Sequence, residues 1–266
     1  MNAVSIGPLV LAADRASAVA GILAFLVVSG LIARKLDESL AKWSSFALFA
    51  GLAAARAGHV AIHWDTFSLE PSRILALWQG GFYWPAGVAA AVILLLRLVR
   101  DGLAKAAGLA SLAVGLFVWH SAMLLTSGVE AIPLPEQPLR TLAGDNVSLA
   151  GLGRQPMVIN LWASWCPPCR REMPMMVETA KASEGIIFVF ANQGEDAPRV
   201  RSYLAMEGID PPSLLLDSLG VLGRHYKAVG MPATLFIGRD GGLVDAHIGE
   251  ISREVFERKI ADLHRD

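Results

Sequence analysis

The sequence predicts a multi-domain protein: a bundle of four membrane-spanning helices followed by an α/β domain. The chain has 266 residues, more than one average domain, with 54% hydrophobic and only 18% charged residues. This composition is too apolar for a water-soluble protein of that size, which indicates membrane segments. The apolar residues are also unevenly spread. They dominate residues 16–126, and from about residue 137 apolar runs alternate with charged and turn residues.

Four stretches approach the roughly 20 apolar residues that a helix needs to cross a bilayer. They cover about residues 16–33, 43–62, 82–99 and 106–126 of a predicted membrane domain at 1–128. The first stretch lacks a clear basic leader and cleavage site, so we expect a retained helix rather than a cleaved signal peptide. Three prolines within residues 129–138 predict an extended linker. The α/β domain then covers residues 139–266.

Basic residues gather in two of the loops between these helices. They are Arg34, Lys35 and Lys42 in the first loop and Arg100 and Lys105 in the third. In the second loop, residues 64–81, one arginine is balanced by two acidic residues. Because short cytoplasmic loops are enriched in Lys and Arg, the first and third loops are predicted to be cytoplasmic. We therefore expect a multi-pass protein of the bacterial inner membrane, with both termini and the α/β domain in the periplasm.

Arg56 lies inside the second predicted helix. A charge there is expensive and usually serves a pathway, a partner or a lipid headgroup. The alternative is that Arg56 lies near the outer interface and extends its charged end to water. The sequence leaves both interpretations open, so Arg56 is a candidate for contact with lipid or a partner.

The same region resembles a family of lipid-modifying enzymes. The residues that carry the resemblance are 54–60 (AARAGHV), Pro71, 74–81 (ILALWQGG) and 6–9 (IGPL). On these motifs, residues 5–125 are similar to the amino-terminal portion of prolipoprotein diacylglyceryl transferase. The chain departs from that family at residues 82–87, which lack its histidine, and in the absence of its later asparagine- and glycine-rich signature. The resemblance implies an anchor, a lipid-contact platform or a docking surface for an electron donor, with lipid transfer or lipid binding as the alternative function.

The second half of the chain alternates strand and helix patterns. Apolar runs rich in β-branched residues predict strands at 157–162 and 186–191, and the following patterns predict a helix at 196–207 and a short strand at 213–217. A strong turn signal joins a hairpin of strands at 234–238 and 243–248. Ser252 is placed to cap a final helix that ends near residue 264. With a helix after the first strand, the predicted order is β-α-β-α-β-β-α.

The chain has only two cysteines, Cys166 and Cys169, both in the run Trp-Cys-Pro-Pro-Cys at 165–169. Such a pair is either half of a zinc site or a redox dithiol. Zinc needs two further ligands, and the histidines of this half have no paired spacing. The pair stands at a strand-to-helix junction, where helix N–H groups stabilise a thiolate on Cys166. This position favours redox chemistry without a metal or cofactor, and a net charge of −1 gives no sign of a nucleic-acid partner.

Two further runs carry a resemblance to a second family. Residues 158–174 read VINLWASWCPPCRREMP and residues 229–237 read VGMPATLFI. On these motifs, residues 134–264 are identified as a thioredoxin-like domain of the TlpA-like periplasmic branch. The resemblance implies a thiol–disulfide oxidoreductase in which Cys166 attacks, Cys169 resolves and the two form the redox disulfide. It also implies a cis bond between Met231 and Pro232 that faces this disulfide and presents backbone to a substrate chain.

The TlpA-like resemblance implies a disulfide-containing protein substrate that is reduced by the dithiol. An outside donor in the membrane must re-reduce the enzyme, because the chain has no flavin or nicotinamide motif. The expected substrate-facing residues are Trp165, Pro167, Pro168, Met231 and Pro232. Arg170 and Arg171 either stabilise the thiolate or lie on an exposed helix face.

Two other positions bear on proton transfer. Glu195, just after the second strand, is either a solvated loop carboxylate or a proton-transfer group. Asn160 stands where many thioredoxins carry a buried acid, so this chain departs from their proton route at that position.

Overall fold

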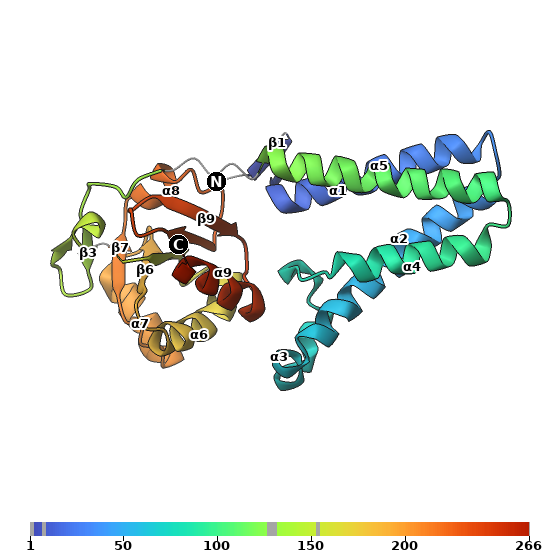
Figure 1. Ribbon diagram of the computed structural model, residues 1–266. Coiled ribbons are helices and arrows are strands. Elements are labelled where there is room, and N and C mark those ends of the chain that lie inside the picture. Colours follow the sequence, from blue (N-terminus) through green and yellow to red (C-terminus); the bar gives the residue numbers. More distant parts are fainter. Residues whose placement is uncertain (1–2, 7–8, 127–131, 153–154, 266) are drawn as a thin grey trace. The chain divides into compact units, whose positions relative to one another are not determined.

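The computed structural model describes residues 3–6, 9–126, 132–152 and 155–265 (Figure 1). Gly7 and Pro8 of the transferase-like motif and residues 129–131 of the predicted linker lie outside the described residues. Contacts divide the chain into two compact units, a helical unit at residues 2–128 and an α/β unit at residues 129–266.

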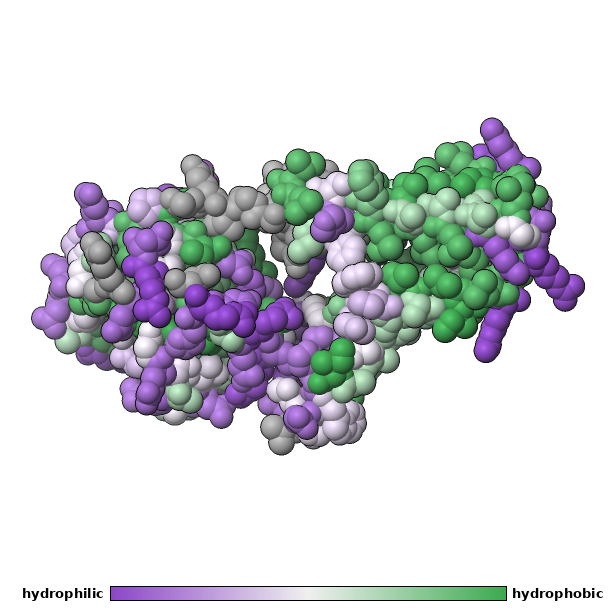
Figure 2. Space-filling model, in the orientation of Figure 1, coloured by the Kyte–Doolittle hydropathy of each residue, from purple (hydrophilic) through white to green (hydrophobic). Residues whose placement is uncertain are grey.

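Long apolar helices build the helical unit. They are α1 (Ala13–Ala33), α2 (Ser39–Ile62), α4 (Trp84–Leu98) and α5 (Gly102–Thr126). A short hairpin precedes them, formed by β1 (Ala3–Ile6) and β2 (Leu9–Ala12). The connection between α2 and α4 contains α3 (Trp64–Leu69), η1 (Pro71–Leu75) and η2 (Leu77–Gln79). In Figure 2, hydrophobic side chains cover much of the surface of the long helices.

The long helices differ in their capacity to cross a membrane. By length and composition, α1, α2 and α5 are long and apolar enough to do so. α4 has 15 residues. At 1.5 Å per residue it is about 22 Å long, whereas a bilayer core is about 30 Å thick. The fourth span, expected at 82–99, therefore stays a prediction.

Glycines let the helices of this unit approach closely. A Cβ atom at Gly21 of α1 would lie 2.6 Å from Cβ of Trp119 in α5. A Cβ atom at Gly87 of α4 would lie 2.8 Å from the carbonyl oxygen of Gly51 in α2. Any larger side chain would push these helices apart, as expected for membrane helices that pack through small residues.

A seven-stranded sheet forms the centre of the α/β unit, in the order β4-β3-β7-β6-β5-β8-β9. Its strands are β3 (Leu139–Thr141), β4 (Asn146–Val147), β5 (Met157–Trp162), β6 (Ile187–Gln193), β7 (Leu214–Asp217), β8 (Ala233–Ile237) and β9 (Leu243–Ile248). β5, β6 and β7 run parallel to one another, and the pairs β5–β8, β8–β9, β3–β7 and β3–β4 are antiparallel. The remaining elements are η3 (Leu149–Leu152), α6 (Pro167–Ala182), α7 (Ala197–Glu207), α8 (Val221–His225) and α9 (Arg253–Arg265).

The central strand β5 divides the hydrophobic core in two. Val158 and Trp162 join the core that α6, α7 and α9 share, whereas Ile159 and Leu161 join the core that contains Leu222 of α8. Alternate residues of a strand point to opposite faces, which produces this division. The whole of β5 is buried, as is typical of a central strand covered on both faces. Because β5 is held on both faces, it fixes the position at which α6 begins.

The predicted order of strands and helices is present, with short additions. β5 and β9 have the expected bounds, and the other predicted elements of this unit begin and end within a few residues of expectation. The additions are β3, β4, η3 and α8, which have between 2 and 5 residues and are too short to show a strand or helix period. The expected cap of α9 is present, since the Val255 N–H reaches Oγ of Ser252 at 3.5 Å.

Candidate active site

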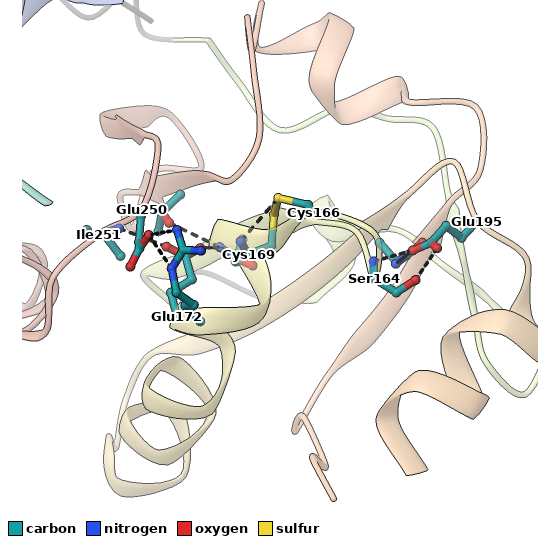
Figure 3. The surroundings of a disulfide bond; sticks show 11 residues. Ser164, Cys166, Cys169, Glu172, Glu195, Glu250 and Ile251 are labelled. Atoms are coloured by element: carbon teal, nitrogen blue, oxygen red, sulfur yellow. Dashed lines mark hydrogen bonds and ion pairs between the residues drawn. A yellow bond between two sulfur atoms is a disulfide. The ribbon is translucent and has the colours of Figure 1, made fainter. Parts of the chain in front are cut away.

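Cys166 and Cys169 form a disulfide bond at the start of α6 (Figure 3). Cys166 is the N-cap of the helix, and Pro167 and Pro168 occupy its first turn. Proline fits there because its fixed φ suits the helix and its missing N–H would have no helical partner. The backbone N–H of Cys169 donates a hydrogen bond to Sγ of Cys166, with an N–S distance of 3.3 Å. Together with the positive end of the helix dipole, this N–H stabilises a thiolate on Cys166 when the disulfide is reduced.

The two cysteines are not equally accessible. Cys166 is 3% exposed and Cys169 is 0% exposed, within an apolar core that also contains Trp162 and Met173. Because Cys169 has no exposed surface, an incoming thiol or disulfide reaches the pair at Cys166. The disulfide therefore has one open end and one buried end.

The residues expected to face a substrate differ in their exposure. Trp165 is 58% exposed, Pro167 is exposed and Pro168 is half-buried. The bond between Met231 and Pro232 is cis, as the resemblance implied. Pro232 is buried, and Met231 packs against the core that contains both cysteines. The structure thus brings Met231 to the disulfide's own core and leaves Trp165 at the surface.

An open pocket of about 330 Å³ lies beside Trp165. It is lined by Trp165, Gly194, Glu195, Asp196 and Arg199. The pocket joins the loop that carries Cys166 to the turn between β6 and α7. Its lining includes an indole ring and a guanidinium group.

Glu195 is buried and fixes the loop before the disulfide. Its carboxylate accepts hydrogen bonds from the Ser164 N–H (2.7 Å), the Ser164 hydroxyl (2.6 Å) and Nδ2 of Asn192 (2.7 Å), and Nε of Arg199 lies 3.0 Å away. Burial alone raises the pKa of Glu195, but these donors outweigh burial and hold that pKa below its ordinary value. With 6% exposure, the interpretation as a solvated loop carboxylate is wrong. A lowered pKa also gives no support to a proton-transfer role near neutral pH.

Glu172 is a second buried carboxyl group, 3% exposed and one turn of α6 after Cys169. Its Oε1 accepts a hydrogen bond from Nδ2 of Asn160 and its Oε2 accepts one from the Ile251 N–H, each with a donor–acceptor distance of 3.0 Å. Burial raises the pKa of Glu172 to about 8, because these two neutral donors replace only part of the lost hydration. Residues three apart on a helix are neighbours on its surface. A group that titrates near neutral pH is therefore adjacent to Cys169.

Glu172 is not among the residues predicted from the sequence. The acid that is missing at Asn160 comes from α6 instead, and Asn160 is hydrogen-bonded to it. A signal was present in the sequence, because Glu172 stands at helical spacing on the core-facing side of α6. The other buried residues of that helix are Cys169, Met173, Met176, Val177 and Ala180. A carboxyl group on an otherwise apolar helix face is a candidate for a perturbed pKa.

In the helical unit, Arg56 is 7% exposed and binds backbone carbonyl groups. Its guanidinium donates to the carbonyl oxygens of Ile74 (3.0 Å), Gly80 (2.7 Å), Gly81 (3.1 Å) and Arg73 (2.6 Å). These carbonyls all belong to the connection between α2 and α4, so Arg56 fastens that connection to α2. Its burial does not support the interpretation that Arg56 reaches water. Contact with lipid or a partner stays a prediction.

The fold and the site together define a class of protein. The α/β unit has the thioredoxin-like fold, with a Cys-x-x-Cys disulfide where a central strand meets its following helix and with a cis-proline before a neighbouring strand. The family model described as Redoxin matches residues 129–263. The chain belongs to the Redoxin family.

Curated relatives agree with this assignment. Thioredoxin-like protein YneN of Bacillus subtilis is 28% identical over 130 residues, which are 47% of this chain and 75% of that protein. Thiol:disulfide interchange protein DsbE of Pseudomonas fluorescens is 31% identical over 156 residues, or 56% of this chain and 86% of that protein. Thiol-disulfide oxidoreductase ResA of Halalkalibacterium halodurans is 27% identical over 121 residues, or 45% of this chain and 68% of that protein. The present protein is a thiol–disulfide oxidoreductase.

Proposed function

We propose that this enzyme reduces disulfide bonds of proteins outside the cytoplasm, with Cys166 as the nucleophile and Cys169 as the resolving cysteine. The observation that carries the proposal is the asymmetry of the pair. Sγ of Cys166 accepts the N–H of Cys169 at the helix start, whereas Cys169 is fully buried. The first arrangement favours a thiolate on Cys166. The second arrangement reserves Cys169 for a step inside the complex with the client protein.

The reaction then proceeds in two exchanges. The Cys166 thiolate attacks one sulfur of the client disulfide, which forms an enzyme–client disulfide and releases the other client sulfur as a thiolate that takes up a proton. Deprotonated Cys169 attacks Sγ of Cys166, which releases the second client sulfur. The client gains two electrons and two protons. The enzyme is left with the disulfide that the structure contains.

Glu172 is the proposed proton acceptor for Cys169 in the second exchange. A general base works best when its pKa lies near the operating pH, and the pKa of Glu172 is about 8. Its position one turn after Cys169 on α6 supports the same role. Asn160 and Ile251 hold the carboxyl group in place through hydrogen bonds to its two oxygens.

The client is proposed to bind across Met231 and Trp165. Backbone groups next to the cis bond pair with an extended client segment in the manner of an added strand. The exposed ring of Trp165 and the adjoining pocket receive client side chains. Pro167 and Pro168 complete the surface around Cys166.

The helical unit is proposed to anchor the enzyme and to meet its electron donor in the membrane. Three helices that are long and apolar enough to cross a bilayer support the anchor. The turns between α1 and α2 and between α4 and α5 lie at the same end of the helical unit (Figure 1). They carry the basic residues Arg34, Lys35 and Arg100, and Lys105 follows in the first turn of α5. Positive charge at one end supports a cytoplasmic location for both turns. The α/β unit, which follows α5 in the chain, then faces the periplasm.

Variants of each cysteine test the assignment in the full-length protein in detergent. Cys169→Ser is expected to accumulate an enzyme–client disulfide with oxidised insulin, because resolution is blocked. Cys166→Ser is expected to form none and to lose all reductase activity. An insulin adduct through Cys169 in Cys166→Ser would contradict the proposed roles. Under the lipid-transfer alternative, Arg56→Ala would abolish function and Cys166→Ser would retain it.

The direction of electron flow needs its own measurement. Reduction, rather than oxidation, rests on the resemblance to the TlpA-like branch. Equilibration of the full-length protein with dithiol–disulfide buffers gives its reduction potential. Known proteins of this kind span about −270 to −120 mV. A value near the negative end is expected for a reductase, and a value near the other end would reverse the assignment.

A further inference from the structure

Arg171 and Glu250 form an ion pair next to Glu172 that the proposed mechanism does not use. Nε and Nη2 of Arg171 both donate to Oε2 of Glu250, at distances of 3.0 and 2.5 Å. The Glu250 side chain is 7% exposed and that of Arg171 is 53% exposed. A buried carboxylate is costly unless it is paired, and Arg171 supplies a charged partner for Glu250 from the solvent side. The expectation of a merely exposed helix face is therefore incomplete for Arg171.

The ion pair and the Glu172 hydrogen bond join the same two segments of chain. Arg171 and Glu172 are consecutive in α6, and Glu250 and Ile251 are consecutive in the turn between β9 and α9. Arg171 binds the Glu250 carboxylate. The Ile251 N–H donates to Oε2 of Glu172, and Figure 3 shows Glu172, Glu250 and Ile251 side by side. The ion pair thus holds the turn in the position from which Ile251 reaches Glu172.

The polar groups around Glu172 and the Arg171–Glu250 ion pair come from four segments of the α/β unit. They are Arg171 of α6, Asn160 of β5, Glu250 and the Ile251 N–H of the β9–α9 turn, and His247 of β9, whose Nε2 lies 3.4 Å from the Glu250 carbonyl oxygen. Burial is the main cause of the raised pKa of Glu172, and the hydrogen bonds from Ile251 and Asn160 oppose it. The charge of Glu250 then raises this pKa further, and the charge of Arg171 lowers it.

We propose that the Arg171–Glu250 ion pair tunes this active site, by setting the pH range over which Glu172 gains and loses its proton. The consequence for catalysis rests on the proposed function of Glu172 as the base for Cys169. Arg171 and Glu250 act through Glu172 and are positioning residues. Because their charges act on Glu172 with opposite sign, removal of one charge at a time shifts its titration in opposite directions. A general loosening of the structure would not produce opposite shifts.

The test is the titration of Glu172 in the full-length protein in detergent. The infrared band of its protonated carboxyl group, assigned by the loss of that band in Glu172→Gln, reports the midpoint. Glu250→Gln keeps the shape and a hydrogen-bond acceptor but removes the negative charge, so the midpoint is expected to fall by about one pH unit. Arg171→Gln removes the positive charge that lowers the pKa of Glu172, so the midpoint is expected to rise by a similar amount.

Three further variants serve as controls. Arg171→Lys keeps the charge and is expected to keep the midpoint near that of the parent protein. Arg171→Gln with Glu250→Gln removes both charges and is expected to lie between the single variants. Arg170→Gln changes the neighbouring arginine, which pairs with Glu207 instead, and is expected to cause no shift. If Glu250→Gln fails to fold, the contrast of Arg171→Gln with Arg171→Lys and Arg170→Gln still tests the proposal, because Arg171 is half exposed.

The pH profile of insulin reduction is the second readout, and it is expected to move with the infrared midpoint in each variant. Midpoints that shift in the same direction in both single variants, or that do not shift, would overturn the proposal. A shifted midpoint with an unshifted rate profile would support tuning by the ion pair and overturn the proton-transfer role of Glu172. The failure of this inference and the failure of the proposed function are therefore distinguishable.

Discussion

Two buried carboxyl groups lie on opposite sides of the disulfide, and the structure holds them in opposite states (Figure 3). Glu172 is 3% exposed and accepts hydrogen bonds from two neutral donors, and its pKa is raised to about 8. Glu195 is 6% exposed, but three neutral donors and Arg199 surround it, and its pKa is held below its ordinary value. Glu172 is surrounded more completely by protein, whereas Glu195 also lines the open pocket beside Trp165, so the depth of burial and the number and charge of the donors together decide the state.

The difference matches what each position has to do. Glu172 is next to Cys169, where a proton must leave before the resolving attack, and a group that titrates near neutral pH suits that step. Glu195 binds Ser164, two residues before Cys166, and a permanent anion there keeps the loop in one arrangement. One side of the disulfide is therefore suited to proton exchange and the other side to rigid support.

Among substitutions of the two carboxyl groups, the largest expected effect is on the rate after Glu172→Gln, which keeps the shape of the side chain and removes its proton chemistry. Insulin reduction is expected to fall by about 100-fold, the lower part of the range for general base catalysis. The rate is also expected to lose its dependence on a group that titrates near pH 8. The control is Glu178→Gln, an exposed carboxylate on the same helix that pairs with Arg253. A parental rate and pH profile in Glu172→Gln would contradict the role of this residue.

The next prediction concerns the free energy of unfolding, to which the two carboxyl groups contribute in different pH ranges. The pKa of Glu172 is raised from 4.5 to about 8, so the unfolded chain releases this proton first as pH rises. The stability linked to its protonated form is present below about pH 4.5 and is lost as pH rises through about 8. The pKa of Glu195 is lowered. Its contribution is present above its ordinary pKa and is lost as pH falls through the lower value in the folded protein.

Denaturant unfolding of the full-length protein across pH, compared with Glu172→Gln and Glu195→Gln, measures both contributions. Glu172→Gln is expected to lose less stability than the parent protein between about pH 5 and 8. Glu195→Gln is expected to be less stable at neutral pH and to lose less on acidification. The same slope change in both variants would show that the two carboxyl groups do not differ in the way described.

The sequence predicts the disulfide site far better than it predicts the protonation state of either carboxyl group. Cys166, Cys169 and the cis bond before Pro232 follow from local motifs, and β5 follows from an unbroken apolar run. The partners of the carboxyl groups do not, because Ile251 lies 79 residues from Glu172 and Ser164 lies 31 residues from Glu195. Which N–H group faces a carboxylate depends on how turns that are distant in the sequence pack together, and the hydrophobic periodicity of the sequence does not predict this packing.

The smallest expected effect comes from Arg199→Gln, which tests whether Glu195 can be made to resemble Glu172. The substitution removes the one charged donor and leaves the three neutral ones, so the pKa of Glu195 is expected to rise toward its ordinary value. Because the Arg199 side chain is 65% exposed, solvent screens the pair, and the loss of stability at neutral pH is expected to be about 0.5 kcal/mol. Acid unfolding is expected to begin at a higher pH than in the parent protein. Arg258→Gln removes an exposed positive charge from α9 and is the matched control, so an equal shift in both variants would show that net charge, and not the Arg199–Glu195 contact, keeps Glu195 ionised.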